Sequence, residues 1–319
     1  MIAGGGGSVG DIVAGMDTSP SGTQWRLAVD GQEATVVEVG GGLRAYSVAG
    51  ESIVDGYEAG ELCPGCAGQV LAPWPNRLRD GRYSFDGTSY QLALTEPPRH
   101  NALHGLVCWL RWSCVDASES AVTLGVDLPP TPGYPWRLRL ETVWSLGPDG
   151  LTAEHRATNV GDRPAPFGLG THPYVWLPGV PVNELVLRVP AQSRLLTDAR
   201  LLPIGAAKVA GGDYDFTAPR RIGTTVLDDA FGDVIREPDG RSVATLSTVD
   251  ASRTVEVWAD EAFRWWQVFS GDTLTEPRYR RSVAIEPMTC PPDALRSGRD
   301  VVVLQPGETW QGIWGIRKG

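Results

Sequence analysis

Short segments of β-type sequence recur about every ten residues along this chain, separated by turns rich in glycine and proline. Its 39 glycines and 25 prolines would interrupt long helices, but they suit tight turns between short strands. We find no helical pattern longer than about two turns. Strands that follow strands without intervening helices favour antiparallel sheets. The sequence therefore predicts an all-β fold, a large antiparallel β-sandwich.

Alternation of polar and apolar side chains marks individual strands. Residues 82–85 and 89–94 flank Asp86-Gly87, a dipeptide that tolerates positive φ, so a hairpin is predicted there. A second hairpin is predicted where residues 137–144 turn back into residues 151–157. Further strands are predicted over residues 34–39, 43–48, 184–189, 242–246, 254–258, 265–269, 282–285, 301–304 and 309–314.

The domain organisation is expected to be simple. Residues 1–23 are rich in Gly, Ser, Asp and Thr without periodicity, which predicts a flexible N-terminal tail. Residues 24–319 contain no Pro/Ser-rich linker and are expected to form one β-sandwich domain. No apolar run approaches the ~20 residues that a membrane-spanning helix needs, and the first residues do not resemble a signal peptide. A cytoplasmic location without membrane contact is expected.

Charge and cysteine content exclude several functions. The net charge is −10, and no cluster of Lys and Arg could neutralise a row of phosphates, so nucleic-acid binding is not expected. The densest basic run, Arg278 to Arg281, is interpreted as the solvated start of a strand. Cys63 and Cys66 form a CxxC, but the chain lacks a second CxxC for zinc and a βαβ context for redox chemistry. We interpret them as a plain pair of loop thiols.

Two candidate acid–base residues share one local feature. His172 lies among glycines, prolines and aromatics in residues 166–178, and Glu286 ends an apolar segment. Each directly precedes a proline, which biases its backbone to an extended conformation and helps to aim the side chain. The structural alternatives are a histidine satisfied within a turn and a carboxylate at the rim of a sheet.

Other polar segments suggest a binding site. Two prolines precede Asn76 and Arg77, and a guanidinium held there could donate several hydrogen bonds to a ligand or pair with a neighbouring acid. His100 and His104 are spaced i, i+4, but Gly105 argues against a helix and the zincin glutamate is absent. No metal site is therefore predicted.

Asp228 and Gln267 lie beside aromatic residues, an expected setting for a sugar with hydroxyl edges and weakly apolar faces. The chain has no GxSxG, GxGxxG or GxxxxGK[ST] motif. Histidines and carboxylates without an activated serine or cysteine point to acid–base chemistry without a covalent intermediate.

From about Gln24 to Gly315, the chain resembles the aldose 1-epimerase (galactose mutarotase) family. The resemblance rests on the order and spacing of several motifs together. These are Pro75-Asn76-Arg77, Asn101-Ala102-Leu103-His104-Gly105, Thr171-His172-Pro173-Tyr174, Asp228-Asp229-Ala230-Phe231, Gln267-Val268-Phe269-Ser270-Gly271 and Glu286-Pro287.

The resemblance implies a galactose mutarotase-like supersandwich that interconverts the α and β anomers of a free monosaccharide without a cofactor or metal. It implies that Glu286 is the general base for the anomeric hydroxyl and that His172 is the acid for the ring oxygen. It further implies that His104 polarises the reacting oxygens. The implied substrate-binding residues are Asn76, Arg77, Asp228 and Gln267.

The sugar and the assembly are left open. Residues 72–81 and 103–107 resemble a bacterial branch that includes sulfoquinovose mutarotases. Leu106, Val175 and Trp176 differ from galactose-type members and are expected to change the pocket wall. The alternatives are a non-catalytic carbohydrate-binding sandwich and an enzyme for phospho- or sulfo-sugars with an anion site near arginines such as Arg77. A monomer or a homodimer is expected.

Overall fold

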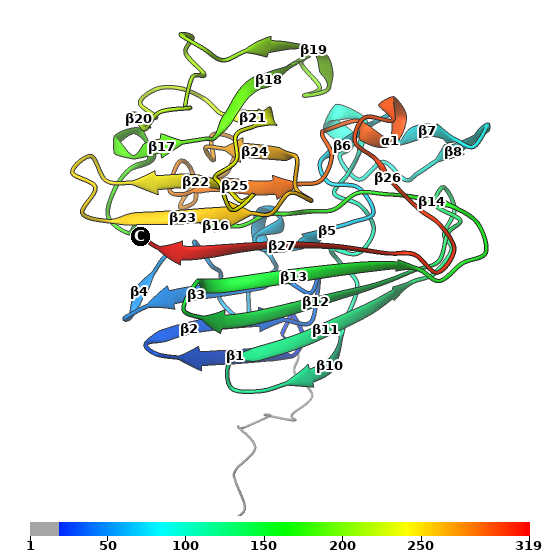
Figure 1. Ribbon diagram of the computed structural model, residues 1–319, viewed down its shortest axis with the longest axis horizontal. Coiled ribbons are helices and arrows are strands. Elements are labelled where there is room, and N and C mark those ends of the chain that lie inside the picture. Colours follow the sequence, from blue (N-terminus) through cyan, green and yellow to red (C-terminus); the bar gives the residue numbers. More distant parts are fainter. Residues whose placement is uncertain (1–18) are drawn as a thin grey trace, which may run out of the picture.

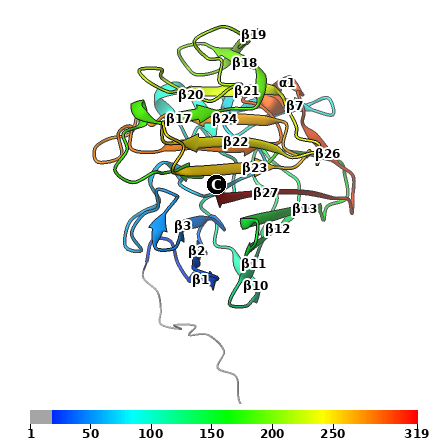
Figure 2. The ribbon, with the colours of Figure 1, turned by 60° about the vertical axis from the view of Figure 1, so that its left-hand side comes forward.

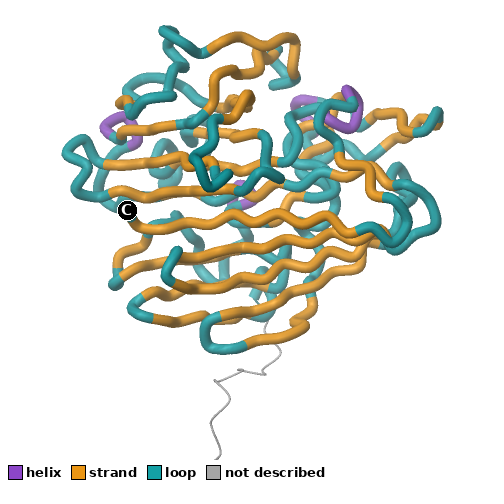
Figure 3. Tube along the Cα trace, in the orientation of Figure 1, coloured by secondary structure: helices purple, strands orange, loops and turns teal. Residues whose placement is uncertain are grey.

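The computed structural model describes residues 19–319 and consists almost entirely of strands and loops (Figures 1 and 3). The predicted all-β class is confirmed. Among the described residues there is one α-helix, and it has four residues. None of the helices in this range has the length and apolar character needed to cross a membrane. The helical segments are α1 (Ala294–Ser297) and the 3₁₀ turns η1 (Pro64–Cys66), η2 (Pro97–Arg99) and η3 (Val182–Glu184).

A nine-stranded antiparallel sheet extends upward from β10 at the bottom of Figure 1. Its middle strands alternate between buried and more exposed residues, so one face is covered and the other is open to solvent. In spatial order, its strands are β10 (Ser113–Ala117), β11 (Ala121–Leu128), β12 (Leu138–Gly147), β13 (Gly150–Asn159), β27 (Thr309–Lys318), β23 (Thr254–Ala259), β22 (Ser242–Ser247), β17 (Val186–Arg188) and β20 (Arg220–Arg221).

Two further sheets cover the buried face of the nine-stranded sheet. The smaller one is made of β1 (Gln24–Val29), β2 (Gln32–Val37), β3 (Leu43–Val48) and β4 (Glu51–Ser52). The larger one runs in the order β19 (Pro203–Lys208), β18 (Ala191–Thr197), β21 (Asp228–Val234), β24 (Trp265–Phe269), β25 (Val283–Met288), β15 (Gly170–Thr171) and β5 (Val70–Leu71), with β16 (Tyr174–Val175) also on β25. Three small ribbons are β14 (Ala165–Phe167) with β26 (Val302–Leu304), β6 (Arg77–Arg79) with β9 (Asn101–Leu103), and β7 (Arg82–Phe85) with β8 (Thr88–Gln91).

The core lies between these layers. Strands β1 and β2 contact β12, and β25 contacts β23, so the four-stranded and eight-stranded sheets pack on different parts of the large sheet (Figures 1 and 2). The indole N–H of Trp266 on β24 donates to the hydroxyl of Ser242 on β22 at 3.1 Å and joins two layers. Only one face of the eight-stranded sheet packs against the nine-stranded sheet. The opposite face can therefore carry a functional site.

Most strand predictions are confirmed, including both hairpins. The first residues of the strand predicted at 184–189 are wrong, because η3 occupies Val182–Glu184 and β17 begins only at Val186. The predicted tail lies outside the described residues up to residue 18. Its last residues belong to the packed body: Ser21 is buried, and its carbonyl accepts a hydrogen bond from the Val39 N–H at 2.9 Å.

His155 is a structural histidine in the core of the nine-stranded sheet. Its Nε2 accepts a hydrogen bond from the Trp314 indole at 2.8 Å, so Nδ1 carries the hydrogen and donates to the Thr142 hydroxyl at 2.8 Å. Burial lowers the pKa of His155 to about 3, so the ring is neutral at neutral pH.

This network predicts the effect of a conservative substitution. Trp314→Phe keeps an aromatic ring but leaves Nε2 of His155 buried without a donor, which is expected to destabilise the fold by about 1–3 kcal/mol in urea unfolding. Trp258→Phe is a matched control on the neighbouring strand, because the buried Trp258 N–H has no partner among the described residues. Equal losses in both variants would contradict the prediction.

Candidate active site

The candidate site lies on the face of the eight-stranded sheet that points away from the nine-stranded sheet. Val283 and Ile285 on β25 point into the main core, so strand alternation places Glu286 on the opposite face. Gln267 on β24 is the direct cross-strand partner of Glu286. Trp266 and Val268, which flank Gln267, also belong to the main core. Ordinary period-two alternation therefore brings two buried polar side chains together.

Glu286 and His172 form the centre of the site. His172 follows β15, and its Nε2 lies 3.4 Å from Oε1 of Glu286. The Tyr174 ring stacks on the imidazole, with ring centroids 4.9 Å apart. Within residues 19–319, Nδ1 of His172 and Oε2 of Glu286 are buried without a hydrogen-bond partner. Because buried polar atoms without partners are costly, these two atoms mark a place for polar atoms of a ligand.

His104 completes the acid–base cluster from a different part of the chain. Its ring lies edge-on to His172, with centroids 5.4 Å apart. Both Asn76 and His104 have positive φ, and the Asn76 N–H donates to Nδ1 of His104 at 3.2 Å. Since Nδ1 accepts, the hydrogen of a neutral His104 ring resides on Nε2. This histidine is therefore held as a hydrogen-bond donor.

Three polar side chains flank the cluster. Nε2 of Gln267 donates to Oδ1 of Asp228 at 2.6 Å, and Nη1 of Arg77 lies 3.6 Å from Oδ2 of the same carboxylate. Oε1 of Gln267 has no partner among the described residues. The structure thus brings together all seven site residues predicted from the sequence: Asn76, Arg77, His104, His172, Asp228, Gln267 and Glu286.

Burial dominates the electrostatics of the site. Desolvation, with the nearby charge of Asp228, raises the pKa of Glu286 well above its usual value. Desolvation lowers the pKa of His172 to about 4. Desolvation, together with the nearby His172 and Arg77, also holds the pKa of His104 well below 6.5. A carboxylate of raised pKa is a stronger base, and an imidazolium of lowered pKa is a stronger acid. In the free protein, the same shifts favour the proton on Glu286 over His172.

Some predicted features lie elsewhere. Val175 is buried in the main core, so the prediction that it alters the pocket wall is wrong. The guanidinium of Arg281 lies over the ring of Trp176, with Cζ 5.3 Å from the ring centroid. The solvated interpretation of residues 278–281 is wrong for Arg278 and Arg280, whose side chains are only 16% and 14% exposed and pair with acids. The run does precede strand β25, as predicted.

The CxxC loop lies beside the site. The hydroxyl of Tyr174 donates to the Gly65 carbonyl at 3.1 Å, between Cys63 and Cys66. Burial raises the pKa of Cys63 to about 12 and that of Cys66 well above its usual value, so both thiols are protonated at neutral pH. His100, the other histidine considered for a metal, is exposed and pairs with Asp80. Within the described part of the chain, no three metal-type ligands cluster.

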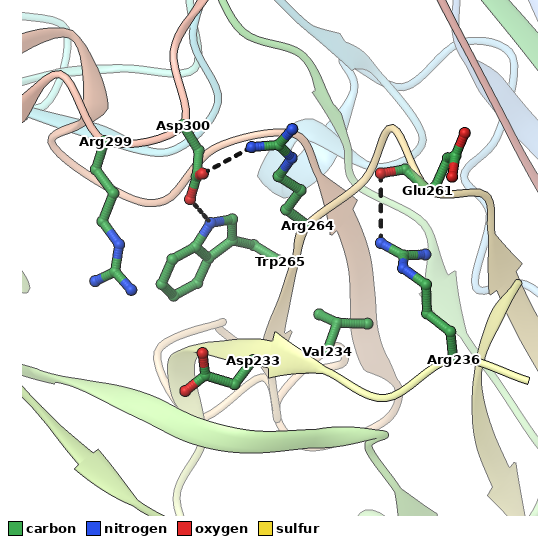
Figure 4. A pocket seen from close by; sticks show the side chains of 8 residues that line it. All are labelled: Asp233, Val234, Arg236, Glu261, Arg264, Trp265, Arg299 and Asp300. Atoms are coloured by element: carbon green, nitrogen blue, oxygen red, sulfur yellow. Dashed lines mark hydrogen bonds and ion pairs between the residues drawn. The ribbon is translucent and has the colours of Figure 1, made fainter. Parts of the chain in front are cut away.

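A separate hollow of about 340 Å³ opens beside Trp265 (Figure 4). Asp300 accepts hydrogen bonds from the Trp265 indole and from Arg264, and Arg236 donates to backbone carbonyls, so these polar groups are already paired. The hollow contains no histidine. It lacks the unpartnered buried atoms that distinguish the cluster around Glu286.

One contributor was missed in the sequence. Glu96 accepts hydrogen bonds from Nε and Nη2 of Arg77 at 3.0 and 3.1 Å. Glu96 directly precedes Pro97, so it carries the same signal that singled out His172 and Glu286. That signal was available in the sequence, two residues after the strand predicted over residues 89–94.

Comparison with known proteins supports the interpretation of the site. A sequence profile of the family described as aldose 1-epimerase matches residues 24–317. The chain is 33% identical to the uncharacterized protein YihR of Escherichia coli K12, over 93% of this chain and 95% of that protein. It is 28% identical to the galactose mutarotase of Bos taurus, over 49% of this chain and 46% of that protein. The galactose 1-epimerase structure from Lactobacillus acidophilus superimposes with a TM-score of 0.78 at 21% identity, covering 93% of this chain and 94% of that one.

The family match defines a sugar-converting isomerase. The structural likeness shows that it shares the β-sandwich fold. The chain belongs to the aldose 1-epimerase family. It is thus a mutarotase whose substrate is a small sugar.

The burial of Glu286 predicts a pH-dependent effect on stability. Because its pKa is raised in the folded state, its contribution is fully present below its unfolded pKa and is lost as the pH rises through the folded pKa. Glu286→Gln has no proton to lose. Its melting temperature is therefore expected to rise relative to wild type as the pH increases above the usual range of a glutamate pKa. Glu58→Gln, at an exposed position, is the control, and a constant difference for Glu286→Gln over this increase in pH would contradict the prediction.

Proposed function

We propose that this chain interconverts the α and β anomers of a free aldose, with Glu286 as general base and His172 as general acid. The observation that carries the proposal is their buried contact at 3.4 Å, with an unpartnered polar atom on each side chain. The anomeric hydroxyl and the ring oxygen of a sugar are attached to the same carbon. The groups that exchange protons with them must therefore also lie side by side.

The proposed reaction balances within the sugar and these two residues. The reactive form is the one in which the proton of Glu286 has passed to His172 across their contact. Ionised Glu286 then takes the proton of the anomeric hydroxyl, a C1–O double bond forms, and the bond from C1 to the ring oxygen breaks. The electron pair goes to the ring oxygen, which His172 protonates. The open-chain aldehyde rotates about C1–C2, and ring closure on the other face reverses both proton transfers. The chemistry requires only a positioned acid and base.

The remaining residues have supporting roles in this proposal. His104 is neutral and offers Nε2–H, so it can donate to a reacting oxygen without adding positive charge. Asn76 binds His104, Arg77 lies beside Asp228, and Gln267 binds Asp228 and is the cross-strand partner of Glu286. Donors and acceptors in fixed positions suit several hydroxyl groups of one sugar ring.

Removal of either proton-transfer group tests the proposal. Glu286→Gln and His172→Asn are each expected to slow anomer exchange by ~10²–10⁴-fold, because each removes one positioned proton acceptor or donor. NMR exchange spectroscopy on glucose, galactose, glucose 6-phosphate and sulfoquinovose measures the rate. Glu256→Gln, in an ion pair between β23 and β27, is a control expected to retain the rate. Wild-type rates in both site variants would refute the roles, and sugar binding without acceleration would favour a non-catalytic sandwich.

The pH profile provides a further test. A bell-shaped pH dependence of kcat/KM is expected. On the acid side, kcat/KM falls where His172, with a pKa of about 4, and Glu286 are both protonated, because Glu286 can then accept no proton. The alkaline limb appears when the pair loses its last shared proton. Because the charge of Asp228 raises the pKa of Glu286, Asp228→Asn is expected to move the alkaline limb to lower pH. Asp127→Asn, an exposed residue on β11, is the control, and an unmoved limb in Asp228→Asn would contradict this coupling.

A further inference from the structure

Glu96 holds Arg77 by a two-point contact. Both Glu96 oxygens accept from Nε of Arg77, at 3.0 and 3.2 Å, and Oε1 also accepts from Nη2 at 3.1 Å. The two side chains are only 10% and 12% exposed. A bidentate arginine–carboxylate contact of this kind fixes the plane of the guanidinium as well as its position.

Glu96 is itself held in place. The side-chain amide of Asn101, which is fully buried, donates to Oε2 of Glu96 at 2.9 Å, and the backbones of Glu96 and Asn101 exchange hydrogen bonds. Arg99 donates to Oε1 at 3.0 Å. Although burial opposes it, the hydrogen bonds from Arg77 and Asn101 hold the pKa of Glu96 below its usual value. Glu96 is therefore a rigid, ionised support.

This contact decides what Arg77 offers to a ligand. Nε and Nη2 are occupied by Glu96, and Nη1 is the nitrogen that lies toward Asp228, at 3.6 Å. Only part of the donor fork remains for a substrate. Glu96 contacts Arg77, Arg77 lies beside Asp228, and Asp228 accepts a hydrogen bond from Gln267. Gln267 is in turn the cross-strand partner of Glu286. A change in the direction of the Arg77 side chain would therefore alter contacts close to the reacting atoms.

The same contacts remove free positive charge from this side of the site. Two arginines, Arg77 and Arg99, are matched by two carboxylates, Glu96 and Asp228. The next arginine on β6, Arg79, lies 3.6 and 3.7 Å from the carboxylates of Asp198 and Asp293. An anionic substituent placed here would have to displace a carboxylate from its arginine, whereas a hydroxyl would not.

We propose that Glu96 is a positioning residue that aims Arg77 and neutralises its charge, so that the site accepts an uncharged aldose beside Arg77. This inference rests on the proposed mutarotase function. It assigns to Glu96 a part in substrate choice and predicts that phospho- or sulfo-sugars are poor substrates of the wild-type chain.

The experiment compares Glu96→Gln, Arg77→Ala and the double variant, with anomer exchange of D-glucose, D-galactose, glucose 6-phosphate and sulfoquinovose followed by NMR. Glu96→Gln keeps the shape of the side chain but loses the charge. It is expected to lower kcat/KM for the neutral sugars by ~10²-fold, mainly through KM, because a misplaced binding group costs that much. Relative to the neutral sugars, exchange of glucose 6-phosphate is expected to improve.

A double-mutant cycle separates positioning from a merely structural role. If Glu96 acts through Arg77, Glu96→Gln adds no further loss in the Arg77→Ala background. Additive losses, or an unchanged KM in Glu96→Gln, would overturn the inference. Glu256→Gln is the matched control, since it breaks an Arg–Glu pair on β23 and β27.

The remaining outcomes are also decisive. If Glu96→Gln fails to fold in a melting experiment, Glu96→Asp retains the charge while shortening the reach, and it must raise KM yet keep the preference for neutral sugars. Efficient wild-type exchange of glucose 6-phosphate would overturn the inference and leave the proposed function intact. Efficient wild-type exchange of sulfoquinovose would have the same meaning, whereas absence of wild-type exchange for all four sugars would refute the proposed function on which the inference rests.

Discussion

The burial of one carboxyl group, that of Glu286, is the constraint around which this site is arranged. Glu286 lies within a strand whose six residues are all buried, and its side chain is 2% exposed. An ionised carboxylate in such a position is costly unless other groups stabilise it. That cost raises the pKa of the carboxyl, so Glu286 keeps its proton in the free protein, and the imidazole of His172 lies close enough to receive it.

Sheet geometry provides this environment at little extra cost. The inward residues of β24 and β25 pack into the main core, while the outward residues carry the chemistry. A rigid scaffold of this kind holds proton donors and acceptors in place before a substrate arrives. The second arrangement, from Glu96 to Arg77 and Asp228, has the same character: each charge is positioned by another charge, and the two arginines are balanced by two carboxylates.

Several parts of the site could be predicted because local sequence carries their signal. A following proline singled out His172 and Glu286, and two prolines singled out Asn76 and Arg77. The same signal at Glu96 was overlooked, since the sequence does not show that Glu96 meets Arg77, 19 residues away. Val175 was misplaced because strand alternation around a two-residue strand could not be assigned before its pairing with β25 was known.

By itself, the sequence determined the all-β class, the two hairpins and the chemical types of the site residues, because turn chemistry and strand alternation are local properties. Only the tertiary structure decided that Glu286 meets His172, that His104 presents Nε2–H, and that Arg77 is neutralised by Glu96. Those facts depend on long-range strand pairing and on burial, and both set protonation and charge balance through the surroundings of each group.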